Sequence, residues 1–211
     1  MISTKHLESM PDIDTLEKIC KSLAMLDAII MPEWDLRYYS FNSKWSKGEK
    51  MASMQNGSGD NYFALFTKKG AILKGFVHDS IMGEKLYPGV LDNVPQVFTE
   101  NFLNEAGFSM ESTSFCIWRL ATDSSWQVGN IDSKSESDPD GSEKLLSIFE
   151  DTPTRYKNWA EQYYEIVLPE TEVIAVFEHQ PLSDELIQAI NPDNSLEDLE
   201  EDVTEIGYLV M

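Results

Sequence analysis

The chain has 211 residues, of which 37 are acidic and 16 are Lys or Arg, so its formal net charge is −21. A charge of this sign and size repels phosphate backbones and anionic lipids, which argues against nucleic-acid and membrane partners. Hydrophobic residues make up 42% of the chain and aromatic residues 11%, a globular composition rather than that of a disordered acidic protein.

The acidic residues are concentrated in the C-terminal third. Residues 1–131 carry 12 basic and 16 acidic side chains, a balance of −4, whereas residues 132–211 carry 4 basic and 21 acidic ones, a balance of −17. A polyanionic segment attached to a nearly neutral body accelerates encounter with basic proteins, although it does not specify a fold. We therefore expect a basic protein as the partner.

Neither an export signal nor a membrane span is recognisable. The first residues, MISTKHLESMPDID, lack a basic region followed by an apolar run, and no later stretch approaches the roughly 18 apolar residues of a membrane span. The sequence thus predicts a cytoplasmic protein. Its two cysteines, Cys20 and Cys116, lie in apolar patterns and are expected to be free core thiols rather than a disulfide.

The first predicted element is a helix. Asp12 and Asp14 offer N-caps, apolar residues recur at helical spacing as far as about Met31, and Pro32 then ends the pattern. A strand is expected to follow over residues 37–45.

That strand would place Tyr39, Phe41 and Trp45 on one face. The segment 47–61, which contains Asn-Gly-Ser-Gly, is expected to be a polar loop.

The clearest local signal is a hairpin from Tyr62 to Val77. Two apolar runs flank Lys68-Lys69-Gly70, and this connection length with its glycine is typical of antiparallel strands. We expect this hairpin to lie at the centre of the sheet.

A short helix is predicted near Pro95, with Phe98 and Phe102 buried. Residues 112–121 and 126–129 are expected to form a second antiparallel pair, and the acidic segment 131–142 to be a surface loop or a hinge.

Beyond this segment the periodicity is helical. A helix is expected after Pro153, another from Ser183 to Ile190, and a last one capped by Ser195. Residues 173–177 fit either a buried strand or a helical turn.

Together these elements predict a single α+β domain over residues 1–211. Its mainly antiparallel sheet would be covered on one face by the N-terminal and C-terminal helices. The C-terminal part would be helical and acidic.

The best metal-like cluster consists of four acids around a Pro-Asp-Gly turn: Glu136, Asp138, Asp140 and Glu143. It does not fit a calcium loop, because placing Gly141 at the sixth position puts Glu136 first and Ser147 twelfth. We expect a solvated turn and no metal site.

No motif for catalysis or for a cofactor is recognisable, and we expect no cofactor. His78-Asp79-Ser80 contains the residue types of a hydrolytic triad, but neighbouring strand residues point to opposite faces. An enzyme remains the alternative hypothesis, a hydrolase or another class, with a pocket assembled from dispersed residues such as His78, Asp79, Glu84 and Tyr87.

The leading hypothesis is a non-enzymatic, cytoplasmic protein-binding domain. Its candidate binding surface is the outward face of the last predicted helix, formed by five acids: Glu197, Asp198, Glu200, Glu201 and Asp202. The sequence does not indicate an oligomeric state.

Five blocks carry a resemblance: YFALFTKKGAILKGF, YPGVLDNVP, SFCIWR, WQVG and NWAEQYYE. They resemble a family of small bacterial soluble proteins to which no activity is assigned. The order of N-terminal helix, antiparallel hairpins and flanking helices is also similar to that of the SMI1/KNR4-like (SUKH) immunity proteins, whose members neutralise partner toxins. This likeness of architecture implies an immunity-like binding protein, and it transfers no site residues.

Overall fold

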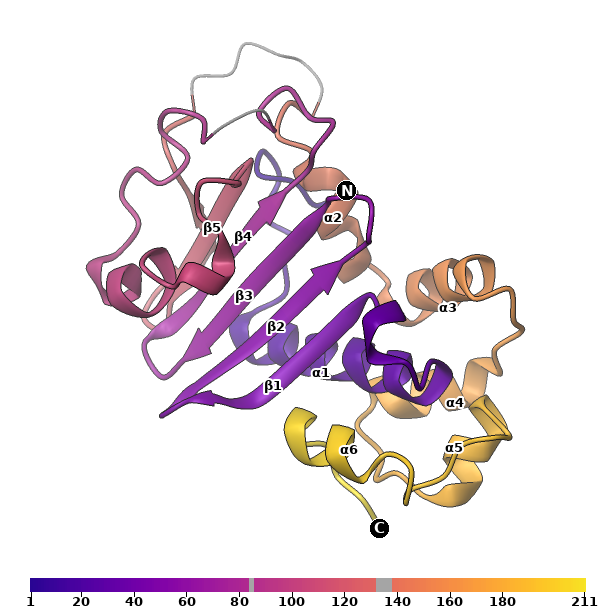
Figure 1. Ribbon diagram of the computed structural model, residues 1–211. Helices are drawn as coiled ribbons and strands as arrows, with labels where there is room; N and C mark the ends of the chain where they lie inside the picture. Colours follow the sequence, from indigo (N-terminus) through magenta and orange to yellow (C-terminus); the bar gives the residue numbers. More distant parts are fainter. Residues whose placement is uncertain (84–85, 132–137) are drawn as a thin grey trace.

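The computed structural model describes residues 1–83, 86–131 and 138–211. Its centre is a sheet in the order β1-β2-β3-β4-β5-β6, in which all neighbouring strands are antiparallel. The strands are β1 (Tyr39–Ser46), β2 (Glu49–Gln55), β3 (Asn61–Thr67), β4 (Gly70–Phe76), β5 (Phe115–Leu120) and β6 (Gln127–Val128). Figure 1 shows this sheet with helices behind it and beside it. The predicted α+β class is confirmed.

The predicted central hairpin is β3–β4. Its register pairs Thr67 with Gly70, so Lys68 and Lys69 form the connection. Gly70 lies close to the next strand, because a Cβ on it would be 2.3 Å from the carbonyl oxygen of Arg119 in β5. The glycine therefore permits both the turn and the approach of β5.

The prediction of a polar loop over residues 47–61 was wrong. Residues Glu49–Gln55 form β2, which pairs with β1 on one side and with β3 on the other. Ala52 and Met54 point into the core. The true turns are Lys47-Gly48 and the segment 56–60.

The first face of the sheet packs against α1 (Ile13–Ile30), whose N-cap Asp12 accepts a hydrogen bond from the backbone N–H of Thr15 at 2.8 Å. Both the predicted cap and the predicted end of this helix are confirmed. The cluster on this face contains buried residues from Ile2 to Tyr208, so the ends of the chain share one hydrophobic core.

The second face is covered as well, which the sequence did not indicate. A segment with a 3₁₀ turn (Gln96–Phe98), a π turn (Thr99–Leu103) and another 3₁₀ turn (Ala106–Phe108) lies over β3–β5. Phe98 and Phe102 are buried as predicted. The expected α-helix is replaced by a 3₁₀ turn, which is wound more tightly than an α-helix, and by a π turn, which is wider. Trp45 stacks on Phe108 of this second face, whereas Tyr39 and Phe41 belong to the core of the first face. The predicted common face is wrong for Trp45, because the pairing of β1 with β2 is irregular between Asn42 and Ser46.

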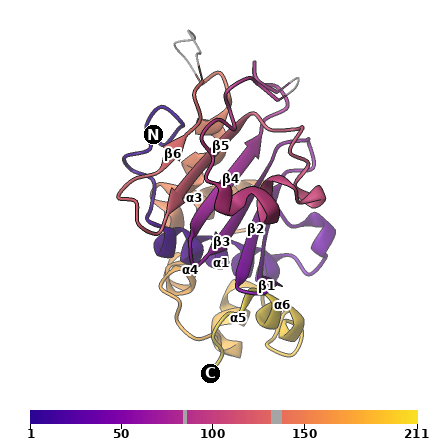
Figure 2. The ribbon, with the colours of Figure 1, turned by 90° about the vertical axis from the view of Figure 1, so that its left-hand side faces the viewer.

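Five helices make up the C-terminal part: α2 (Ser142–Leu146), α3 (Thr152–Tyr163), α4 (Glu170–Phe177), α5 (Asp184–Ile190) and α6 (Glu200–Ile206). The ambiguous segment 173–177 is helical. Ser183 caps α5 as predicted, whereas α6 begins at Glu200, later than expected. Figure 2, turned so that the β5 side faces the viewer, shows α4, α5 and α6 at the base of the sheet.

Cys20 and Cys116 are buried free thiols, one in each of the two hydrophobic clusters, as the sequence predicted. Within the described ranges, no helix has the length and apolar character needed to cross a bilayer.

Candidate functional site

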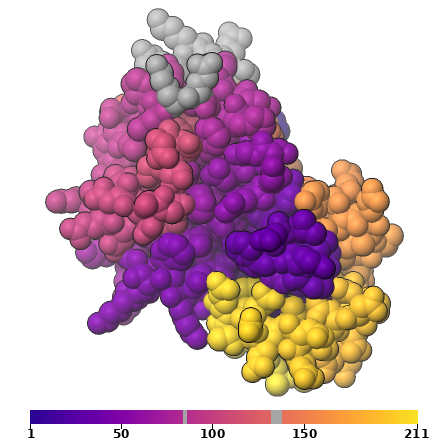
Figure 3. All heavy atoms as spheres, viewed as in Figure 1, coloured from indigo at the N-terminus to yellow at the C-terminus, as the bar shows by residue number. Residues whose placement is uncertain are grey.

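The five acids of the predicted binding surface lie on α6 and on the turn before it. Glu197, Asp198, Glu200 and Glu201 are exposed, and Asp202 is half-buried. Figure 3 shows the C-terminal residues in yellow as one lobe at an end of the molecule. We call the four exposed side chains the acidic α6 surface.

Asp202 has a different role from the other four. Its carboxylate accepts hydrogen bonds from Arg37 at 2.5 Å and 3.0 Å, and the Arg37 side chain is only 8% exposed. Arg37 also donates to the backbone carbonyls of Met31 and Pro32. Asp202 therefore anchors α6 to the segment that precedes β1.

The acidic α6 surface has no cationic partner in the described part of the chain. None of its four carboxylates forms an ion pair with another described residue. Residues 158–211 contain 14 Asp and Glu but no Lys or Arg. Part of this acidity has a structural role, because α4, α5 and α6 each carry acids in the first turn, where the helix dipole stabilises them.

An exposed aromatic side chain lies beside α6. Trp34, in the 3₁₀ turn Trp34–Leu36, is 61% exposed, and it lines a hollow of about 240 Å³ together with Asp202 and Glu205. Exposed tryptophans of this kind are common anchors of protein interfaces.

A second cluster of charged groups surrounds Asp60, a buried carboxylate in the turn between β2 and β3. One carboxylate oxygen accepts from His78, from both its backbone N–H at 3.0 Å and its Nδ1 at 2.6 Å. The other accepts from the Lys144 ammonium at 2.7 Å and from the Asn56 amide at 3.0 Å. These donors hold the pKa of Asp60 at about 2, because their hydrogen bonds outweigh the desolvation that would raise it.

The sequence did not single out Asp60, and only part of the pocket that it suggested exists. His78 and Asp79 do lie in this cluster, since Lys144 also approaches Asp79 at 3.5 Å. Tyr87 instead packs against the hydrophobic cluster of the second face, and Glu84 lies outside the described residues. The partner of His78 is thus a carboxylate 18 positions away rather than its neighbour.

A metal ion could in principle use this cluster, because ligand atoms of Asp60, His78 and Asp79 lie within 4.8 Å of one another. The Lys144 ammonium, however, contacts two of the three, and it provides the positive charge that a cation would supply.

Next to Asp60 is a cavity of about 490 Å³ between the end of the sheet and α3. Its wall includes Tyr38 just before β1, Lys144 of α2, and four residues of α3: Arg155, Asn158, Trp159 and Gln162. The Tyr38 and Trp159 rings are 4.7 Å apart between centroids. We call this the α3 cavity.

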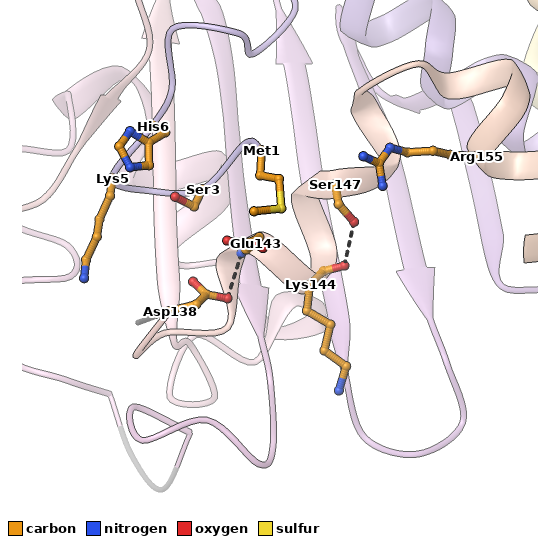
Figure 4. A pocket seen from close by; sticks show the side chains of 9 residues that line it. All are labelled: Met1, Ser3, Lys5, His6, Asp138, Glu143, Lys144, Ser147 and Arg155. Atoms are coloured by element: carbon orange, nitrogen blue, oxygen red, sulfur yellow. Dashed lines mark hydrogen bonds between the residues drawn. The ribbon is translucent and has the colours of Figure 1, made fainter. Parts of the chain in front are cut away.

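A neighbouring hollow of about 560 Å³ shares Lys144, Ser147 and Arg155 with the α3 cavity. Figure 4 shows that its side chains diverge: Lys5, His6, Lys144 and Arg155 point in different directions around Glu143. The side chains that Figure 4 draws around this hollow do not converge on one point.

The acidic cluster of the sequence lies at the edge of that hollow. Asp138 accepts from the Ser142 hydroxyl and the Glu143 N–H, and Asp140 accepts from the Ser142 N–H and the Thr4 hydroxyl. All four carboxylate oxygens are therefore used to fix the start of α2 and the N-terminal segment. Glu136 lies outside the described residues.

Comparisons of this chain with protein-family models, with curated proteins and with solved structures return no match.

Proposed function

We propose that this chain is a non-enzymatic, cytoplasmic protein-binding protein that presents the acidic α6 surface to a basic partner protein. The observation that carries the proposal is that four exposed carboxylates lie together on and before α6 with no ion pair among the described residues. Unpaired surface charges of one sign steer a complementary partner and increase its association rate.

Two further features support this surface as a contact. Trp34 offers an aromatic anchor beside the charges, and charged rims around an aromatic centre are typical of protein interfaces. Asp202 contributes to the surface indirectly, because its pairing with Arg37 fixes the orientation of α6.

The biological role that we propose is immunity-like and bacterial. It rests on the likeness of element order to the toxin-neutralising SUKH proteins. A basic toxin is the kind of partner whose charge matches this surface.

The test is a comparison of two variants with the same change in charge. The α6 variant carries Glu197→Gln, Asp198→Asn, Glu200→Gln and Glu201→Gln. The control carries Glu165→Gln, Glu170→Gln, Glu178→Gln and Glu185→Gln, which are also exposed. A partner is first captured from a bacterial lysate at low salt, identified and purified, and its association rate with each variant is then measured.

At low salt we expect the α6 variant to associate with the partner about tenfold more slowly than the wild type does. The control should slow association by less than about threefold, because the charges nearest the interface dominate steering. Equal rates for both variants would show that the acidic α6 surface acts only as a solubilising face.

A hydrolase is the second candidate, and one observation favours it. Asp60 holds His78 through Nδ1, and Nε2 has no partner among the described residues, which is the arrangement of an oriented general base. Turnover of an ester or phosphoester panel that is lost in His78→Gln and kept in His6→Gln would support it. Absence of turnover across the panel would count against it.

A further inference from the structure

The α3 cavity has a charge that is unusual for this protein. Its wall contains two cations, Lys144 and Arg155, and one acid, Asp60. The hollow beside α6, by contrast, is lined by Lys44 and by three acids: Glu200, Glu201 and Glu205. The lining side chains of the α3 cavity are thus positive by one charge in a chain of −21. Asp79 and Glu150 pair with the two cations from outside the lining, so it is the remaining N–H donors of Lys144 and Arg155 that favour an anionic group.

The charge of Asp60 is already compensated inside the protein. Its carboxylate accepts four hydrogen bonds, two from His78, one from Asn56 and one from Lys144. The Lys144 side chain is 51% exposed, and among the described residues Arg155 forms an ion pair only with Glu150, at the surface. Both cations therefore keep N–H donors that a ligand can reach.

One face of α3 lines the cavity. Arg155, Asn158, Trp159 and Gln162 follow one another at helical spacing, so the row spans about 10 Å from the guanidinium end to the amide end. The amides of Asn158 and Gln162 have no hydrogen-bond partner in the described part of the chain. This row therefore offers a cation, an aromatic ring and free amides along a single line.

The lining also includes aromatic and apolar side chains, among them Tyr38, which contacts Trp159, and Leu145 and Ile148. The Tyr38 hydroxyl has no hydrogen-bond partner among the residues described. The cavity volume of about 490 Å³ is within the roughly 300–1,000 Å³ of small-molecule sites.

From this arrangement we infer that the α3 cavity binds a small aromatic oxyanion. The phosphate or carboxylate of the ligand bonds to Arg155, its planar ring packs against Tyr38 and Trp159, and the edge of the ring bonds to the amides of Asn158 and Gln162. Mononucleotides and aromatic carboxylic acids share this chemistry. The site contains no residue of the acidic α6 surface, and it shares no lining residue with the hollow of Lys44, Glu200, Glu201 and Glu205.

The experiment is calorimetric titration of the full chain at low salt. The nucleotide probes are AMP and GMP, the carboxylate probes are indole-3-carboxylate and 4-hydroxybenzoate, and inorganic phosphate and adenosine represent the two halves of a ligand. We expect at least one complete aromatic oxyanion to bind with a Kd below about 1 mM, more tightly than either half. Binding of a nucleotide probe would identify the ligand as a mononucleotide, and binding of a carboxylate probe would identify it as an aromatic carboxylic acid.

Arg155→Gln should weaken that binding about tenfold or more, because a charge-assisted hydrogen bond is lost. The matched control is Lys157→Gln, which removes the same charge from α3 outside the cavity, where Lys157 pairs with Glu161. We expect the control to change the Kd by less than about twofold, since a surface charge that is already paired acts weakly at a distance.

Trp159 provides an independent readout. Ligand binding should change the intrinsic fluorescence of the wild type and of Trp34→Phe, but not that of Trp159→Phe. The inference is overturned if no complete probe binds below about 1 mM. It is also overturned if phosphate alone binds as tightly as the complete ligand, or if the two α3 charge variants weaken binding equally.

Discussion

The Asp27 carboxylate accepts a 2.7 Å hydrogen bond from the Tyr156 hydroxyl, although the two residues are 129 positions apart. Its other oxygen accepts from the backbone N–H groups of Tyr38 and Tyr39, each at 2.9 Å. One fully buried carboxylate thus joins α1, β1 and α3. Burial raises the pKa of Asp27 to about 6, since these hydrogen bonds offset only part of the desolvation.

The raised pKa of Asp27 predicts that this residue makes stability fall as pH rises. Below the unfolded-state pKa of 3.8 the group is protonated in both states, and between 3.8 and about 6 only the folded state retains the proton. The contribution of Asp27 to the free energy of unfolding should therefore decrease by about 2.5 kcal/mol between pH 4 and pH 7.

Asp27→Asn, which cannot ionise, isolates this effect. The free energies of unfolding of wild type and variant are measured with denaturant across this pH range. The stability of the wild type relative to that of Asp27→Asn should decrease as pH rises. Asp14→Asn on the exposed side of α1 is the control and should follow the wild type. Parallel curves for wild type and Asp27→Asn would mean that Asp27 is ionised throughout.

A second prediction concerns the pair of Arg37 and Asp202. Asp202→Asn should lower the free energy of unfolding by about 1–3 kcal/mol, because it leaves a mostly buried guanidinium without its charged partner. Glu201→Gln, one position earlier and exposed, should change it by less than about 0.5 kcal/mol. Equal effects in chemical denaturation would show that the pair contributes no more than an ordinary surface charge.

The sequence predicted those elements in which local signals agreed. The β3–β4 hairpin has two apolar runs and a turn of suitable length, and α1 has a cap, a helical period and a proline stop. Strand β2 lacked such signals, because Glu-Lys-Met-Ala-Ser-Met-Gln contains no β-branched or aromatic residue. It is a strand because β1 and β3 pair with it on both sides, which is tertiary information.

The sites were less predictable than the fold, since their partners are distant in sequence. Asp60 stood in a glycine-rich turn, and its partners His78 and Lys144 come from other elements. The α3 periodicity indicated an ordinary packed helix, and Tyr156 and Ala160 are indeed buried. The neighbouring face, with Arg155, Asn158 and Gln162, faces a cavity that only the placement of α2 and β1 creates.

Phe66 provides a test of the core. It is 2% exposed in β3 and its ring lies 6.2 Å from that of Phe41. Phe66→Ala should therefore lower the free energy of unfolding by about 3–5 kcal/mol, through lost transfer energy and an unfilled cavity. Trp34→Ala, at an exposed position, should cost less than about 1 kcal/mol. A loss below about 1 kcal/mol for Phe66→Ala would contradict its burial.

We expect chelator to leave the thermal midpoint unchanged. Each carboxylate oxygen of Asp138 and Asp140 accepts a hydrogen bond from the chain. In the Asp60 cluster the Lys144 ammonium provides the positive charge that a metal ion would supply. The measurement is thermal unfolding with EDTA and with added calcium or zinc. Stabilisation by micromolar metal would show that one of these clusters is a metal site.

The final prediction concerns salt and the acidic C-terminal part. Fourteen acids between residues 158 and 211 face no Lys or Arg in that segment, so their mutual repulsion opposes the folded state at low ionic strength. Raising NaCl from about 0.02 M to 0.3 M shortens the Debye length from roughly 20 Å to below 10 Å, and it should increase the free energy of unfolding by about 1 kcal/mol.

The α6 variant with four neutralised acids should be more stable than the wild type at low salt. Added NaCl should stabilise it less than it stabilises the wild type, because part of the repulsion is already removed. Potassium sulfate, which also strengthens hydrophobic burial, is a poor substitute for NaCl here. If added NaCl increases the free energy of unfolding of the wild type and of the α6 variant equally, the salt effect does not originate in the acidic α6 surface. The helix dipoles of α4, α5 and α6 would then already balance the acids in their first turns.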